Sequence, residues 1–151
     1  MHEVERITDQ LKRAFEGPAW HGPAVLEVLE GITAAQAARR PIAKAHTIWE
    51  LVLHTTVWED VVRRRALGEK VELTEEQDWP AVTDTGAAAW KAALARLEVG
   101  HEALRAVMAS FDPKRLDDPL VPGGSTAYVQ FHGAIQHDLW HAGQIMLLKK
   151  G

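Results

Sequence analysis

Two histidines four residues apart, His137 and His141 in the segment HDLWH, are the strongest candidates for chemistry in this sequence. Positions four apart on an α-helix differ by about 40° in direction, so the two imidazoles can converge on one metal ion. Both lie on or beside an apolar stripe formed by Phe131, Ala134 and Ile145. A divalent ion would satisfy two buried imidazoles that are otherwise costly. The alternative is a pair of core histidines that only pack and hydrogen-bond.

A third ligand is predicted at His54, which lies about two turns into a second helical segment. That segment has an apolar stripe of residues at helical spacing, made up of Thr47, Leu51, His54, Trp58 and Val61. His54 can meet the pair if the second and last helices are neighbours. Three neutral histidines leave a tetrahedral ion with an open position, which is typical of catalytic zinc sites. An open position lets the ion lower the pKa of water or bind a thiolate or carbonyl ligand.

Three polar residues close to the histidines have two possible roles each. Glu50, one turn before His54, could orient that imidazole or act as a base, or it could be the capping-box partner of Thr47. Asp138 has a similar claim to an orienting role. Gln144, three residues after the last histidine, could hydrogen-bond to it or bridge two helices.

Two further residues are candidates for the wall of a pocket beside the ion. Trp58 lies one turn after His54, although tryptophans at helical spacing are more often core residues. His101 lies in the middle of a core seam, where a buried histidine with one hydrogen-bond partner is the simpler interpretation.

Other metal and hydrolase motifs are incomplete in this chain. HDLWH has the spacing of the zincin motif with Asp138 in place of glutamate, but the ten residues after His141 contain no His, Asp or Glu. The His137–Asp138 pair resembles a phosphohydrolase dyad, yet no later aspartate follows. Glu98 and His101 match half of a di-iron bundle motif, and the second half is absent.

Helical periodicity dominates the segments that must position these residues. Long helices are predicted over 4–17, from Thr47 to Gly68, over a seam from Trp90 to Phe111, and from Ser125 or Thr126 to Lys150. Residues 22–32 form a short helical piece, and Thr33 opens another turn with capping-box spacing. Residues 68–86, with six acidic residues against one lysine, are predicted to be a surface crossover. The pattern favours an all-α fold, a four-helix bundle with a crossover connection, as one domain over residues 1–151.

Composition narrows the class of protein. The net charge is −4, which gives no electrostatic basis for binding nucleic acid or an anionic membrane. No apolar run approaches the roughly 20 residues of a membrane span, and the first ten residues lack the features of a secretory signal. The chain has no cysteine, so a thiolate nucleophile or ligand cannot come from the protein. We therefore expect a cytoplasmic protein that acts on a small molecule.

Three segments together resemble the DinB-like superfamily of metal-dependent enzymes, in particular its YfiT-like branch. They are AWHGPAVLEVLEGITAAQA, HTIWELVLHTTVWE and GAIQHDLWHAGQI, and the likeness extends from about residue 3 to 149. The paired histidines followed by Ala-Gly-Gln-Ile are the most specific part.

The resemblance implies a four-helix bundle with crossover topology that holds a divalent ion, often nickel or zinc. By position the ligands are His54, His137 and His141, and members often form homodimers. Characterised relatives include transferases and isomerases that depend on low-molecular-weight thiols, and others are described as hydrolases. The leading hypothesis is therefore a metal-dependent thiol transferase or hydrolase. The alternative is a non-catalytic, metal-stabilised bundle that binds a ligand or mediates dimerisation.

Overall fold

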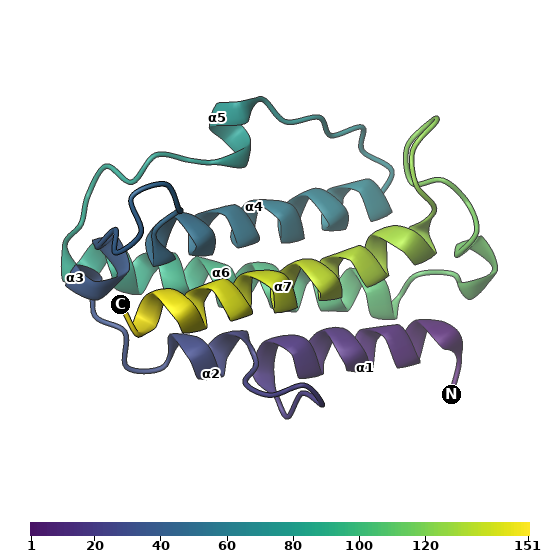
Figure 1. Ribbon diagram of the computed structural model, residues 1–151. Coiled ribbons are helices and arrows are strands. Elements are labelled where there is room, and N and C mark those ends of the chain that lie inside the picture. The colour runs from purple at the N-terminus through teal and green to yellow at the C-terminus, as the bar shows by residue number, and fades with distance from the viewer.

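The protein, described here over residues 1–151 by a computed structural model, is built from helices, with no β-strand. Four long helices lie side by side (Figure 1). They are α1 (Glu3–Glu16), α4 (Ile48–Ala66), α6 (Ala87–Ala109) and α7 (Ala127–Lys149). The shorter elements are α2 (Val25–Leu29), α3 (Ala34–Ala38), α5 (Glu75–Asp78) and a 3₁₀ turn, η1 (Pro113–Arg115). The predicted all-α bundle is confirmed, and the predicted helical piece at 22–32 is confined to α2.

Two helices that follow one another in the bundle, α4 and α6, run in the same direction and pack together (Figure 1). Trp49 and Trp90, each near the start of its helix, have ring centroids 5.0 Å apart. Parallel neighbours need a connection that returns along the full length of the bundle. The segment between Ala66 and Ala87 makes this return over the outside of α4, and it carries α5 at its midpoint. In contrast, α4 and α7 are antiparallel neighbours.

Side chains at the helix starts fix the boundaries of α4 and α7. The Thr47 hydroxyl accepts a hydrogen bond from the Glu50 N–H at 3.1 Å, and the Glu50 carboxylate accepts one from the Thr47 N–H at 2.7 Å. This reciprocal capping box satisfies two backbone donors that the helix leaves unpaired. Of the two candidates for the last helix, Thr126 is the N-cap, and its hydroxyl accepts from the Val129 N–H at 3.3 Å.

The apolar interior is divided into two clusters with a layer of polar side chains between them. One cluster gathers near the start of α4 and the end of α7, and the other near the end of α4 and the start of α7. Along α6, His101 lies between Leu97 of the first cluster and Leu104 of the second. The buried polar residues of the interior are Thr47, His54, Thr55, Glu59, His101, Asp138 and His141.

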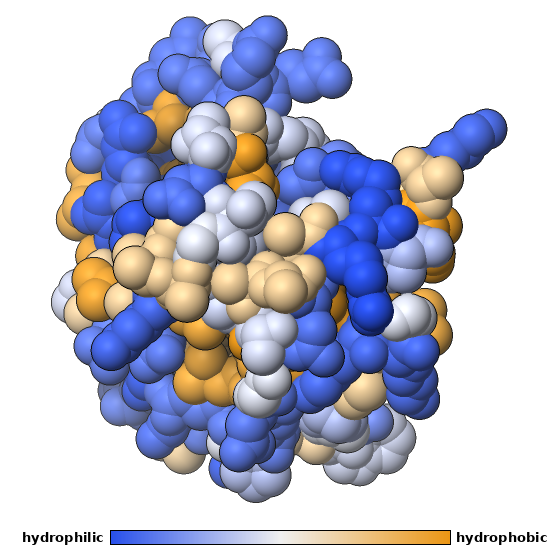
Figure 2. All heavy atoms as spheres, turned by 90° about the vertical axis from the view of Figure 1, so that its left-hand side faces the viewer, coloured by the Kyte–Doolittle hydropathy of each residue, from blue (hydrophilic) through white to orange (hydrophobic).

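The end of the molecule where α3 and the C-terminus lie is largely hydrophilic, with a band of moderately hydrophobic residues across its middle (Figure 2). None of the helices combines the length and hydropathy needed to cross a bilayer.

The α6 seam allows a direct test of the packing. Leu104 is fully buried whereas Val99, on the same helix, is 67% exposed. Leu104→Ala is expected to lower the free energy of unfolding by about 2–5 kcal/mol, because it leaves a cavity between packed helices. Val99→Ala, the control, is expected to change it by less than about 0.5 kcal/mol. Urea denaturation measures both, and equal losses would contradict the assigned faces of α6.

Candidate metal centre

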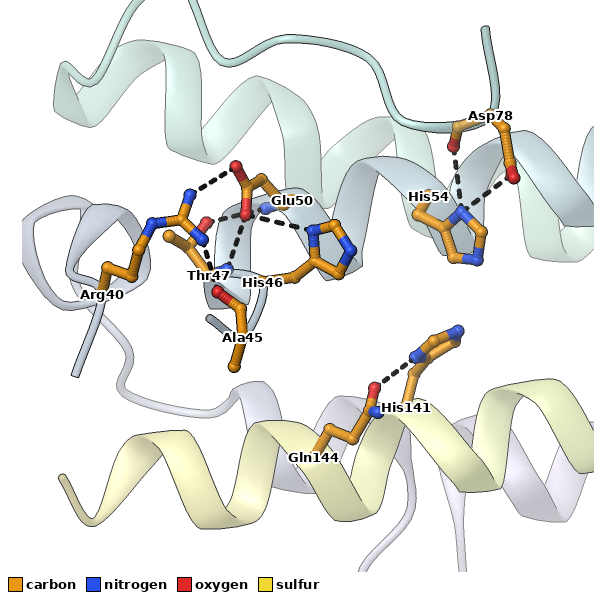
Figure 3. A network of polar contacts seen from close by, with 9 residues as sticks. All are labelled: Arg40, Ala45, His46, Thr47, Glu50, His54, Asp78, His141 and Gln144. Atoms are coloured by element: carbon orange, nitrogen blue, oxygen red, sulfur yellow. Dashed lines mark hydrogen bonds and ion pairs between the residues drawn. The ribbon is translucent and has the colours of Figure 1, made fainter. Parts of the chain in front are cut away.

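Three imidazoles meet where α4 packs against α7. The Nε2 atom of His137 lies 3.0 Å from the Nε2 atom of His54 and 3.0 Å from that of His141. One nitrogen from each ring belongs to a group whose members lie within 4.8 Å of one another. The rings of His54 and His141 point toward one another from the two helices (Figure 3). The structure therefore brings together the three histidines that the sequence singled out, and the group has no fourth member.

Two of the three histidines, His137 and His141, lie in surroundings that favour the neutral ring. His54 and His141 are buried, and His137 is half-buried. Burial, reinforced by the two neighbouring imidazoles, lowers the pKa of His137 to about 3. Burial also lowers the pKa of His141, against the opposing effect of its hydrogen bond to Gln144. Neutral imidazole is the form that coordinates a metal ion.

The outward-facing nitrogens of two rings are held by oxygen atoms. The Nδ1 atom of His54 lies 2.9 Å from the Asp78 carbonyl oxygen and 3.0 Å from its carboxylate. The Nδ1 atom of His141 lies 2.6 Å from the Gln144 side-chain oxygen. Because these oxygens accept hydrogen bonds, each Nδ1 carries the ring hydrogen and each Nε2 presents a lone pair. Such contacts fix the tautomer and orientation of metal-ligating histidines.

The three Nε2 atoms have too few ring hydrogens to form hydrogen bonds with one another. With neutral rings, the Nε2 atoms of His54 and His141 have no hydrogen to donate. His137 can supply at most one, yet its Nε2 lies 3.0 Å from both of the others. At most one of these two contacts can therefore be a hydrogen bond, and the other brings two electronegative nitrogen atoms together with no hydrogen between them. A cation among the three nitrogens removes this repulsion, so the donor set fits a divalent ion.

The crossover segment forms the outer wall of the cluster. The Trp79 ring is stacked between His54, at a centroid distance of 3.7 Å, and His46, at 3.5 Å. The Trp58 indole N–H donates to the Asp78 carboxylate at 2.6 Å. The segment predicted to serve only as a connection thus supplies one side of the site.

The structure places Glu50 away from the three histidines. Its carboxylate accepts from the Thr47 N–H and from the Arg40 guanidinium, and lies 3.4 Å from His46 (Figure 3). Burial acts to raise its pKa, but the Thr47 N–H and Arg40 outweigh it and hold the pKa of Glu50 below its ordinary value. The capping-box interpretation is confirmed. The contact with the His54 ring that was considered for Glu50 is made by Asp78, because Asp78 approaches Nδ1 from the crossover.

The two candidates for a pocket wall, Trp58 and His101, lie in different surroundings. Trp58 and His137 both line a pocket of about 310 Å³ between α4 and α7. His101 lines no part of it. The His101 ring is buried, stacks on Phe15 at 3.7 Å and lies 2.9 Å from the Glu59 carboxylate. His101 is therefore enclosed by core side chains and has one polar partner, as the simpler interpretation of this residue expects.

Asp138 faces a different environment from the adjacent His137. Its carboxylate lies close to Glu59 and His101, in a second group of potential ligands. Burial raises the pKa of Asp138 to about 8, and burial together with the nearby Asp138 raises the pKa of Glu59 well above its ordinary value. Burial, and then the charge of Arg105, lowers the pKa of His101 to about 3.

Sequence reasoning missed Asp78, Trp79 and Glu59, although two of them leave a signal. Trp79 is a single large aromatic residue in an acidic stretch, and such a residue is expected to pack against the helices and hold the segment in place. Glu59 has helical spacing with Thr55 and Val62, which places it on an inward stripe, although a carboxylate at such a position is usually exposed. The role of Asp78 has no such signal, because it depends on how the crossover lies over α4.

These features define a helical bundle with a crossover and a three-histidine group in its interior. The family model of the DinB superfamily matches residues 19–145, which is most of the chain, and the protein therefore belongs to this metal-binding superfamily. Comparisons with curated proteins and with solved structures give no match.

The stacked position of Trp79 leads to a prediction about the crossover. Trp79→Ala is expected to lower the free energy of unfolding by about 1–3 kcal/mol, since two ring contacts and buried area are lost. Cleavage after Glu72, Glu75 or Glu76 by a glutamate-specific protease should become faster.

The control is Trp140→Ala, which removes a tryptophan that is 68% exposed and should leave both measurements nearly unchanged. Unaltered proteolysis of the Trp79 variant would show that stacking does not hold the crossover in place.

Proposed function

We propose that the protein is a metal-dependent enzyme in which His54, His137 and His141 hold a divalent ion, zinc or nickel. The reaction is transfer of a low-molecular-weight thiol to an electrophilic small molecule, or hydrolysis of such a molecule. The observation that carries this proposal is the meeting of three Nε2 atoms that share at most one hydrogen. Membership of a metal-binding superfamily supports the same conclusion.

The number of protein ligands supports a catalytic ion. Structural zinc sites are usually closed by four side chains, whereas catalytic sites have three and an open position. The histidine group has three members, and a pocket of about 310 Å³ lies beside His137. When bound, such an ion acts as a Lewis acid that lowers the pKa of a thiol or water ligand and polarises a carbonyl group.

The chain's own residues have defined parts in this scheme. Asp78 and Gln144 hold two imidazoles in the tautomer that points Nε2 inward. Trp79 covers the outer face of His54 and keeps water from it. Trp58 lines the pocket where a small acceptor molecule would lie.

The source of the nucleophile follows from composition. Because the chain has no cysteine, the nucleophilic sulfur must come from a free thiol. In the transfer, this sulfur forms a bond to the electrophilic carbon, the leaving group departs with its electron pair, and the thiol proton passes to solvent. In the hydrolytic version, water takes the place of the thiol.

One observation favours a second candidate, a non-catalytic bundle that uses the ion for stability and acts as a ligand-binding or dimerising module. His54 is bonded to Asp78 of the crossover, so an ion on His54 would also tie the crossover to α7. The two candidates differ in whether bound metal supports turnover or only raises stability.

Metal uptake tests the site itself. Untagged native protein, stripped with chelator and then given zinc or nickel, is expected to retain metal after desalting. An ion present at about 100 times its dissociation constant should raise the free energy of unfolding by about 2.7 kcal/mol. The variants His54→Gln, His137→Gln and His141→Gln should each retain one ion fewer per chain, because a ligand is lost.

His21→Gln, which alters an exposed loop histidine, is the matched control and should retain the native metal content. Elemental analysis measures the metal bound per chain in each protein. Three variants with native metal content would contradict the assignment of the ligands.

Turnover separates the enzyme from the stability module. Native protein loaded with metal is screened with small thiols and an electrophilic acceptor, and product is measured by mass spectrometry. Chelator or His141→Gln should reduce the rate about 100-fold or more, because a Lewis acid contributes several kcal/mol to such a reaction. Metal-bound, stable protein that is inactive with every thiol and with water would favour the non-catalytic module.

A further inference from the structure

A second group of potential ligands lies in the interior, outside the three-histidine cluster. Glu59 of α4, His101 of α6 and Asp138 of α7 bring one side chain each from three packed helices. They are 1%, 1% and 0% exposed, respectively. One nitrogen or oxygen atom from each lies within 4.8 Å of the others. This group is as deeply buried as the apolar core around it.

Most polar atoms of this group have no partner. The only contact between its members is the 2.9 Å distance from His101 Nδ1 to one Glu59 oxygen. The second Glu59 oxygen, His101 Nε2 and both Asp138 oxygens make no hydrogen bond. Buried polar atoms without partners are strongly unfavourable, and buried carboxylates without a counter-charge are more so.

Neither carboxylate of this group is paired with a basic side chain. No lysine or arginine forms an ion pair with Glu59 or Asp138; the one ion-pair contact of the group is with His101. Arg65, which lines the adjacent pocket, donates instead to the Val71 carbonyl and Gln130. Adding protons to the carboxyl groups would remove their charge, but it would leave oxygens unpaired and create donors that also need partners.

We propose that Glu59, His101 and Asp138 form a second binding site for a divalent cation, separate from the three-histidine site. Two carboxylates and one neutral imidazole balance a charge of +2, so the filled site is neutral in the dry interior. A donor set of two oxygens and one nitrogen suits zinc or manganese. Ligand atoms around a tetrahedral zinc ion lie about 3.3 Å apart, so the side chains need to close by at most about 1.5 Å.

The pocket between α4 and α7 offers a path to this site. Glu59 and Asp138 line the pocket of about 310 Å³ that also reaches His137. On another side the Phe15 ring stacks flat against His101, with ring centroids 3.7 Å apart and planes 7° apart. A cation would therefore enter from the pocket, and the same pocket can provide its remaining ligand. This inference does not depend on the proposed function, because it uses none of the residues assigned to the first ion.

The experiment counts ions in protein that lacks one site or the other. Native protein, Glu59→Gln and Asp138→Asn, which alter the second site, and His141→Gln, which alters the first, are prepared without tags and stripped of metal. Each is titrated with zinc and with manganese by calorimetry, and bound metal is measured after desalting. We expect two ions per chain in the native protein and one in each of the three variants.

Thermal unfolding gives a readout that does not require metal analysis. Without metal, Asp138→Asn should unfold at a temperature no lower than that of the native protein, because a neutral amide avoids the cost of keeping a carboxyl group without a partner in the dry interior. With zinc, its further rise should be smaller than the native rise. Because Asn is nearly isosteric with Asp, it also keeps the test available if Glu59→Gln does not fold. In a crystal of zinc-soaked native protein, an anomalous peak is expected among the three side chains.

The outcomes distinguish this proposal from the proposed function. One ion per native chain, lost in His141→Gln and retained unchanged in Glu59→Gln and Asp138→Asn, overturns the second site and leaves the first. One ion that is lost in the two carboxylate variants and retained in His141→Gln supports the second site and overturns the first. No bound ion in native protein overturns both.

Discussion

A layer of buried polar side chains across the middle of the bundle is the constraint on which the rest of the structure depends. Two apolar clusters close the bundle on either side of this layer. Within it, imidazoles and carboxylates meet with too few hydrogens, and no lysine or arginine forms an ion pair with Glu59 or Asp138. An interior of this kind is costly unless something outside the chain supplies positive charge. The packing of α4 against α6 and α7 therefore leaves buried polar atoms that the proposed cations would partner.

The crossover topology has a direct consequence for the histidine cluster. Because α4 and α6 are parallel neighbours, the chain must return along the outside of the bundle between them. That return passes over His54, and the site uses it to place Asp78 and Trp79 on the ring. A simple up-and-down bundle with a short turn after α4 would leave this ring exposed to solvent on that side. The long connection is thus part of the site as well as part of the topology.

The sequence was sufficient for those parts of the structure that depend on local periodicity. The Thr47 capping box, the seam containing His101 and the i, i+4 spacing of His137 and His141 are all properties of single helices, and single helices follow from short-range patterns. The shared point of the three histidines also followed, because one helix contact was enough to bring His54 to the pair. The partner of His54 could not be predicted, since Asp78 reaches it through the path of an irregular segment that no periodicity describes. Glu59 was overlooked for a different reason: a carboxylate on an apolar stripe is usually exposed, and only the packed structure shows it buried.

Consecutive residues of α7 serve two different groups, since His137 faces the histidine cluster while Asp138 faces Glu59 and His101. Neighbouring side chains on a helix differ in direction by about 100°, so the position of α7 sets the directions of both side chains. If α7 rotates or slides so that His137 moves closer to the histidine cluster, Asp138 moves as well, in a different direction. A change in the rotation or register of α7 therefore alters both groups at once, whereas substitution of a single side chain can alter one group and leave the other in place.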